Sequence, residues 1–208
     1  MALQRATVGF SPHSGWAAAV VLTGPVARPE LIDRRRFLLA EPDDHVGKQP
    51  LHAAEEMPLA QATRLVDRCV ADSRQRAVAE LRGLASDLEK RGYTLAAGGL
   101  CGKEGRPLGS LAAILGSHAL IHAAEGEVFR QVLRDAAADH RIAFADVLER
   151  EAEARCAKAV RLPVETVRSH LAAMGREAGP PWTKDQKLAA LVAWGCLGGR
   201  RAPTRAPR

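Results

Sequence analysis

ATVGFSPHSGWAAAVVLTG (residues 6–24) consists of two apolar runs joined by the short polar stretch SPHSG. Pro12 and Gly15 mark that stretch as a turn, and the flanking runs have the composition of strands. Because so short a connection leaves no room for a crossover helix, the two runs are predicted to pair as antiparallel strands. A third run, ELIDRRRFLLA (30–40), follows the turn GPVARP, so the chain is predicted to open with an antiparallel meander of three strands.

Beyond residue 58 the pattern changes to helices that alternate with strands. Residues 41–58 are predicted to be a polar loop, because they contain two interior prolines. A strand that follows a helix is expected to pair in parallel, so the order predicts an α/β protein with a mixed five-stranded sheet flanked by helices. The predicted helices are 59–91, 109–137, 150–159, 163–175 and one that begins near Thr183, where Gln186 completes capping-box spacing; the predicted strands are YTLAAGGL (93–100) and IAFADVL (142–148).

The basic charge of the chain is concentrated at its end. The net charge of +6 over 208 residues falls to +2 without Arg200, Arg201, Arg205 and Arg208. Residues 1–198 are therefore predicted to form one nearly neutral domain, and residues 199–208 a disordered basic tail. Such a tail is expected either to contact phosphates without sequence specificity or to serve only as a solubilising end.

Several classes of protein have no support in the sequence. There is no apolar run long enough to span a membrane, no signal-peptide pattern, no GxxxxGK[ST] loop and no GxSxG motif. The four cysteines are widely separated and form no CxxC pair, as is typical of reduced core residues. The expectation is a cytoplasmic protein that has no membrane partner.

The predicted helix 109–137 carries polar groups where an apolar face is expected. His118, His122 and Glu125 are spaced i, i+4 and i+7, within the arc that also contains Ile114 and Ile121. Burial of two imidazoles and a carboxylate costs several kcal/mol unless the groups are paired, hydrogen-bonded or ligated. Two interpretations stay open: a satisfied structural network, or a polar or metal-binding site.

The element order and two short motifs resemble the ribonuclease H-like fold of retroviral integrases, transposases and bacterial Holliday-junction resolvases. The first motif is Gly9–Phe10–Ser11–Pro12, which is similar to the G-[IF]-D-P of the resolvases; the second is Lys184–Asp185–Gln186 before an Ala/Leu-rich helix. The resemblance implies hydrolysis of nucleic acid with two Mg²⁺ ions held by four carboxylates. Ser11 takes the place of the first carboxylate, Glu104 lies beyond the fourth strand, and Asp185 lies near the last position.

The resemblance therefore predicts a nucleic-acid-binding or nucleic-acid-processing protein with an altered site. If the first strand faces the polar helix, His13 and Ser14 approach its imidazoles. The predicted catalytic residues are His13, His118 and Glu125, and the predicted substrate-binding residues are Ser11, Ser14 and Arg168. A divalent ion (Mg²⁺, Mn²⁺ or Zn²⁺) is predicted on His118, His122, Glu125 and Asp185, a donor set that suits Zn²⁺ or Mn²⁺ better than Mg²⁺. Nucleic acid and a second copy of the chain are the predicted partners.

Two alternatives remain. RLPVETVRSHLAAMGREAG (161–179) resembles the recognition helix of LuxR-type helix-turn-helix regulators, in which Arg168, Ser169 and Arg176 would face DNA. The same stretch is also an ordinary amphipathic helix that packs on the body through Val167 and Leu171. In the second alternative the fold is a noncatalytic scaffold that binds other proteins.

Overall fold

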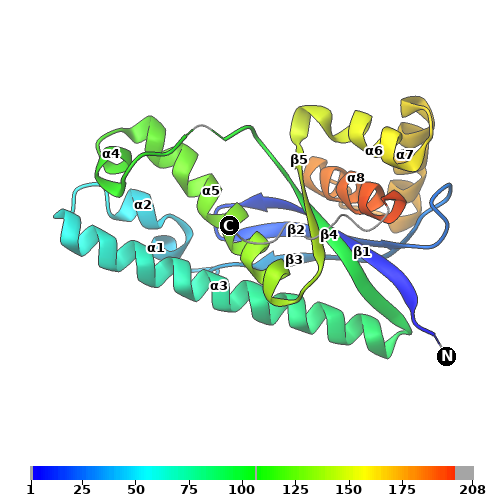
Figure 1. Cartoon of the computed structure of the whole chain (residues 1–208), viewed down its shortest axis with the longest axis horizontal. Helices are drawn as coiled ribbons and strands as arrows, with labels where there is room; N and C mark the ends of the chain where they lie inside the picture. The colour runs from blue at the N-terminus through cyan, green and yellow to red at the C-terminus, as the bar shows by residue number, and fades with distance from the viewer. Residues whose placement is uncertain (1, 106, 200–208) are drawn as a thin grey trace.

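The computed structural model of the chain describes residues 2–105 and 107–199 (Figure 1). The five strands are β1 (Gln4–His13), β2 (Trp16–Thr23), β3 (Glu30–Leu38), β4 (Tyr93–Gly102) and β5 (Ala143–Leu148). The helices are α1 (His45–Lys48), α2 (Pro50–Ala53), α3 (Leu59–Lys90), α4 (Leu111–Leu115), α5 (His118–Asp139), α6 (Ala152–Val160), α7 (Val164–Ala178) and α8 (Lys184–Gly198), with a 3₁₀ turn at Glu149–Glu151.

The strands form one mixed sheet in the order β3-β2-β1-β4-β5. β1 pairs antiparallel with β2, and β2 with β3, whereas β4 is parallel to β1 and β5 is parallel to β4. The predicted fold class is therefore confirmed. The turn after β1 is tighter than predicted, because Ser11 and His13 still pair with β2 and only Ser14 and Gly15 turn the chain. Gly15 permits this with a φ of +78°.

Helices cover both faces of the sheet, and each face has its own apolar core. α3 and α5 pack on one face, where Phe10, Phe37 and Phe129 are fully buried. α6, α7 and α8 enclose the other core around Trp194, whose Nε1 donates to the Val26 carbonyl at 2.8 Å. Figure 1 shows the two helical layers, with α1, α2 and α4 gathered at the end of the molecule where α3 begins.

β1 and α8 approach each other unusually closely. The Thr7 hydroxyl donates to the Ala193 carbonyl at 2.7 Å. A Cβ atom placed on Gly9 would lie 1.9 Å from the Ala189 carbonyl oxygen. Thr7, Gly9, Ser11 and His13 alternate along the strand toward α8, so this side of β1 is fixed against that helix along its length.

The prediction of a loop over residues 41–58 was wrong, because this segment contains α1 and α2. The Asp44 side chain accepts from the Gly47 backbone at 2.8 Å and so caps α1. Pro50 occupies the first position of α2, where its missing N–H is not needed. Helices of four residues each have too little periodicity to be recognised in a sequence.

The prediction of one helix over 109–137 was also wrong. The chain breaks after α4 at Gly116 and Ser117, and α5 then begins at His118. His118 and His122 are exposed, with a side-chain exposure of 63% for His118, so only Glu125 is buried as expected. His118 and His122 are exposed because the first two turns of α5 extend beyond the end of the sheet, where they meet α2.

The helix cap, the cysteines and the hydropathy of the helices can each be compared with what the sequence predicted. Thr183 and Gln186 form the predicted capping box at the start of α8. All four cysteines are free, and three of them are buried. None of the helices within 2–105 and 107–199 is long and apolar enough to cross a membrane. The tail arginines Arg200, Arg201, Arg205 and Arg208 lie outside the described residues.

Arg34 on β3 fixes the connection between α7 and α8. Its guanidinium donates to the carbonyl groups of Ala178, Gly179 and Pro181 at 2.8, 2.9 and 2.6 Å. We expect Arg34→Ala to lower the free energy of unfolding by about 2 kcal/mol and to increase amide exchange in residues 176–184. Arg34→Lys should recover only part of this loss, because an ammonium group cannot reproduce the fork of donors. Unchanged exchange in Arg34→Ala would contradict this role; hydrogen exchange with urea denaturation provides the measurement.

Candidate functional site

The carboxyl end of β1 meets the start of α8 at Asp185. The Ser11 hydroxyl donates to Asp185 Oδ1 at 3.3 Å, and His13 Nε2 lies 3.0 Å from the same oxygen. Both partners lie on β1 two residues apart, so their side chains point to the same face of the sheet. Asp185 therefore lies beside Ser11, the residue in the place of the first carboxylate, as the resemblance implied. Its Oδ1, however, already interacts with both Ser11 and His13.

An aromatic and cationic stack continues from this point across the edge of the sheet. The His13 ring lies parallel to the Trp16 indole, with ring centroids 4.4 Å apart. The Arg36 guanidinium lies 4.0 Å from the centroid of the same indole, within the range of a cation–π interaction. His13 and Arg36 are exposed, so this stack presents positive charge and an aromatic surface to solvent.

The other acidic groups near the ends of β4 and β5 are engaged by basic side chains. Glu149 forms an ion pair with Lys184, and Glu104 forms one with Arg150. Burial raises the pKa of Cys101, at the end of β4, to about 11, so its thiol is protonated at neutral pH. Two Mg²⁺ ions need several free carboxylate oxygens. A serine, a protonated thiol and three paired carboxylates do not fit that requirement.

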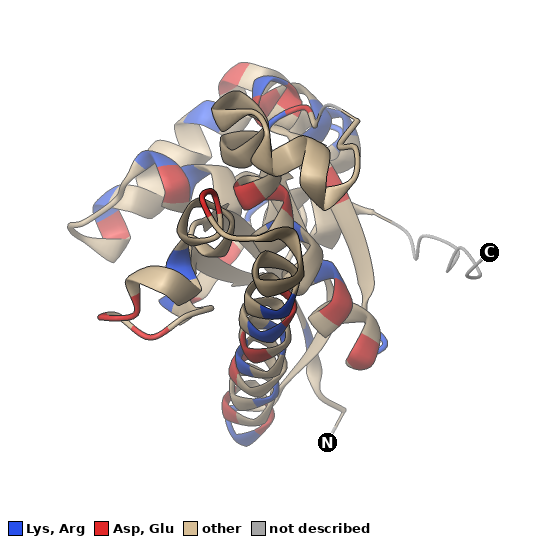
Figure 2. Ribbon diagram, turned by 90° about the vertical axis from the view of Figure 1, so that its left-hand side faces the viewer, with Lys and Arg blue, Asp and Glu red and all other residues tan. Residues whose placement is uncertain are grey.

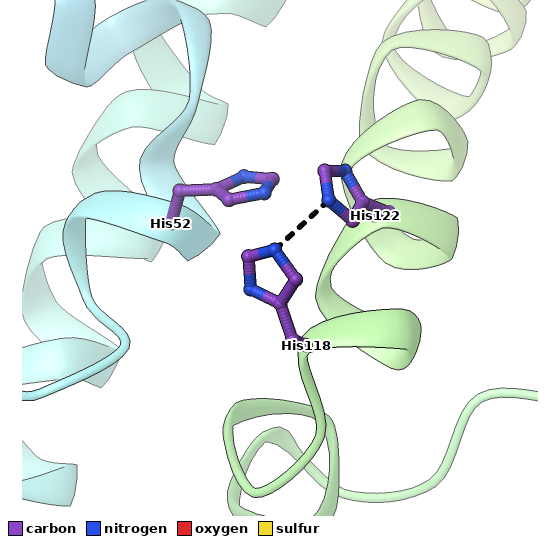
Figure 3. Close-up of side chains that lie close together, drawn as sticks. All are labelled: His52, His118 and His122. Carbon is purple, nitrogen blue, oxygen red and sulfur yellow. Dashed lines mark hydrogen bonds between the residues drawn. The ribbon is translucent and has the colours of Figure 1, made fainter.

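A second group of polar side chains joins α2 to the start of α5 (Figure 3). His52 comes from α2, and His118 and His122 lie one turn apart on α5. The Nε2 atoms of His118 and His122 are 3.1 Å apart. One ligand nitrogen from each of the three rings lies within 4.8 Å of the other two. We call these three residues the histidine cluster.

The buried carboxylate of Glu125 contacts His52, one of the three residues of the histidine cluster. Its Oε2 lies 2.9 Å from His52 Nδ1 and accepts from the His52 backbone N–H at 3.3 Å. Leu51 also hydrogen-bonds to this carboxylate through its backbone, so Glu125 caps the first turn of α2 from another helix. Burial raises the pKa of Glu125, and the hydrogen bonds from His52 and the backbone oppose that shift. The buried carboxylate predicted from the sequence thus finds its partners on α2 through Oε2, whereas Oε1 is buried and has no hydrogen-bond partner among the described residues.

The structure divides the predicted site into two parts. His118 and His122 lie together, with Glu125 behind them, but Asp185 lies with Ser11 and His13 on the α8 face of the sheet. Within the described residues, no hydrogen bond or ion pair connects the two groups. The expected approach of His13 and Ser14 to the imidazoles of α5 is therefore not found, because β1 presents His13 to α8 and Ser14 belongs to the turn.

His52 was not among the site residues predicted from the sequence. The residue lies in the segment interpreted as a loop, 66 positions before His118. Only packing of α2 on α5 brings the two together, so local spacing contained no indication of the pair. The unexplained burial of Glu125 was the one available sign that a partner had to come from elsewhere.

A cavity of about 570 Å³ lies between α5 and the ends of β4 and β5. Its charged wall contains Arg130 and Arg134, both bonded to Glu127, and Arg134 also reaches Asp146. Burial alone would raise the pKa of Glu127, but the two guanidinium groups outweigh it and hold that pKa below its usual range. Arg130 and Arg134 are thus both paired with carboxylates, and these four side chains form a structural network in the wall.

The proposed recognition helix is α7. Val167, Leu171 and Met174 are buried against the body, as the amphipathic interpretation expected. Arg168 is exposed and bonded to Glu153 at 2.7 Å and to Glu165 at 2.7 Å. Two carboxylates beside Arg168 neutralise the charge that a phosphate or a base would need, so the structure offers little for DNA recognition by this helix.

Comparison with known proteins gives a fold but no closely related sequence. No protein-family model and no curated protein match this chain. The structure is similar to that of Thermus thermophilus RuvC in complex with a Holliday junction substrate, with a TM-score of 0.54 and 11% sequence identity over 93% of each chain. A second structure of Thermus thermophilus RuvC gives a TM-score of 0.51 and 12% identity, again over 93% of each chain. These similarities show that the chain shares its fold, the ribonuclease H-like fold, with RuvC.

Proposed function

We propose that this ribonuclease H-like protein binds nucleic acid at the end of the sheet where β1 finishes. We also propose that it does not hydrolyse nucleic acid with two metal ions at the contact between β1 and α8. The observation that carries the proposal is the joint arrangement of Ser11, His13 and Asp185. The resemblance to the resolvases implies a metal-binding carboxylate near this position, but Asp185 is bonded to Ser11 and His13. The likeness to a RuvC structure bound to a Holliday junction supports nucleic acid as the partner.

The His13–Trp16–Arg36 stack supplies the contact chemistry for such a partner. A guanidinium group pairs with phosphate, and the exposed His13 ring offers an aromatic surface on which a base can stack without sequence preference. Ser14, after His13, would add a hydroxyl group that orients a phosphate, whereas Ser11, also predicted to bind substrate, is buried and donates its hydroxyl to Asp185. Figure 2 shows basic and acidic segments interspersed over the ribbon, so we expect few phosphate contacts and moderate affinity.

We expect Arg36→Ala to weaken binding of a labelled four-way DNA junction about three- to tenfold. Removal of one phosphate contact should also lower the slope of log affinity against log salt by about 1. The measurement is fluorescence anisotropy at several salt concentrations. Arg82→Ala, an exposed arginine on α3, is the matched control and should leave both affinity and slope unchanged. Equal losses in the two variants, or an absence of salt-dependent binding in the wild type, would contradict the proposal and favour a noncatalytic scaffold.

The hydrolysis part of the proposal has its own test. Labelled junction, duplex and single-stranded DNA and RNA would be incubated with Mg²⁺ or Mn²⁺. We expect no cleavage that depends on Asp185, because Ser11 supplies no charge and Asp185 is bonded to His13. Cleavage by the wild type that is lost in Asp185→Asn would overturn this part and establish a working two-metal site with an unusual donor.

A further inference from the structure

The three rings of the histidine cluster face a common point between α2 and α5 (Figure 3). We infer that His52, His118 and His122 form a binding site for a single transition-metal ion of the Zn²⁺ class. A tetrahedral ion with Zn–N bonds of about 2.0–2.1 Å holds its nitrogen ligands about 3.3 Å apart. The Nε2 atoms of His118 and His122 are 3.1 Å apart, and the third nitrogen lies within 4.8 Å of both.

Two carboxylates orient the rings so that Nε2 is the free nitrogen. His52 Nδ1 lies 2.9 Å from Glu125, and His118 Nδ1 lies 3.2 Å from Glu55. An ionised carboxylate can only accept, so a neutral ring bonded to it carries its proton on Nδ1 and presents a lone pair on Nε2. Metal-binding histidines in proteins are held in the same way, with the second nitrogen donating to a carboxylate.

One buried nitrogen in the cluster lacks a hydrogen-bond partner among the described residues. His52 Nε2 is buried and makes no hydrogen bond with any part of the chain that the structure describes. The contact between His118 and His122 uses the nitrogens of those two rings and leaves His52 unsatisfied. A purely structural network would place this nitrogen against a donor, whereas a metal ion would satisfy all three nitrogens at once.

The donor set indicates the class of ion. Three neutral imidazoles suit Zn²⁺, Co²⁺, Ni²⁺ or Cu²⁺, whereas Mg²⁺ prefers oxygen ligands. The His118 side chain is 63% exposed, so a fourth ligand can come from water or from a small anion. Three protein ligands and one open position distinguish such a centre from a closed structural zinc site.

The site would also tie the short helix α2 to α5. α2 has only four residues and depends on Glu125 for its first turn. The cluster lies beyond the carboxyl ends of β3 and β4, at the same end of the sheet as Ser11 and Asp185, but on the opposite face. The inference does not rest on nucleic-acid binding, and either proposal can fail without the other.

The test is metal uptake by the untagged full-length protein. After treatment with EDTA, we expect it to take up one equivalent of Zn²⁺, measured by elemental analysis after dialysis, and to melt several degrees higher with the ion bound. Co²⁺ as a probe should give the visible absorption of a four-coordinate nitrogen site. Millimolar Mg²⁺ should neither compete with Zn²⁺ nor raise the melting temperature.

Variants separate this site from adventitious binding. His118→Ala and His122→Ala change exposed side chains, so the fold should persist, and Zn²⁺ affinity should fall at least about 100-fold. His45→Ala is the matched control, an exposed histidine on the neighbouring α1, and should retain affinity within about twofold. Glu55→Gln should weaken binding about tenfold through the orientation of His118. Uptake below a stoichiometric level, equal affinity in His122→Ala, or loss in His45→Ala would each overturn the inference.

Discussion

Gly9→Ala is expected to lower the free energy of unfolding by about 3 kcal/mol or more, the largest effect of any single methyl group that we predict. The new Cβ would lie 1.9 Å from the Ala189 carbonyl oxygen and 2.7 Å from the Ala193 nitrogen. Both atoms belong to the backbone of α8, so no side-chain rotation can relieve the overlap. The helix would have to move away from β1, which would disrupt the Thr7–Ala193 hydrogen bond and the buried contacts of Trp194.

Urea denaturation followed by circular dichroism measures this loss. Gly83→Ala is the matched control, because the new Cβ on this glycine of α3 would meet no heavy atom within 4 Å among the described residues beyond its chain neighbours and the adjacent backbone of its own helix. In that exposed helical position alanine should raise stability by about 0.5–1 kcal/mol. Opposite signs for the two substitutions would support the close packing of α8 on β1. A stable Gly9→Ala protein would show that this packing is wrong.

Glu125→Ala is expected to destabilise the metal-free protein by about 2–4 kcal/mol. The change removes the acceptor for the His52 ring and for the first backbone amides of α2, and it leaves a cavity in the space that the side chain filled. Amide protection should be lost first over residues 45–54, since Glu125 links this segment to α5. The measurements are urea denaturation and hydrogen exchange in the presence of EDTA, so that a bound metal cannot contribute.

Glu56→Ala provides the control for this prediction. Glu56 is exposed and lies shortly after α2, and removal of its carboxylate should change stability by less than about 0.5 kcal/mol. Glu125→Gln keeps one oxygen as an acceptor for the amides of α2 and should therefore lose less stability than Glu125→Ala. Equal stability of Glu125→Ala and wild type would contradict the role of Glu125 as the cap of α2.

The β1–α8 group and the histidine cluster differ in how many of their side-chain atoms remain available to bind a metal ion. The β1–α8 group consists of Ser11, His13 and Asp185, whose side chains bind one another. The histidine cluster has no counterpart in the motifs that resembled the resolvases, and it offers the better donor set for a metal. The two proposals thus concern separate groups of residues, one for nucleic acid and one for a metal ion.

The sequence by itself determined the sheet and most of the helices. Apolar runs of strand length with tight turns predicted the meander β1–β3, and the alternation that followed predicted β4 and β5 as parallel strands. These patterns are local, because backbone hydrogen bonding and burial repeat every two residues in a strand and every 3.6 in a helix. The capping box at Thr183 was predicted for the same reason, since all of its atoms lie within one turn.

Only the tertiary structure decided which polar residues meet. The sequence grouped His13 and Asp185 with His118, but the alternation of β1 toward α8 placed the first two on the other face of the sheet. It identified Glu125 as a buried group in need of a partner, yet His52 had to come from a four-residue helix with no periodicity to recognise. Contacts between distant segments depend on how whole elements pack, and side-chain spacing along one element does not contain that information.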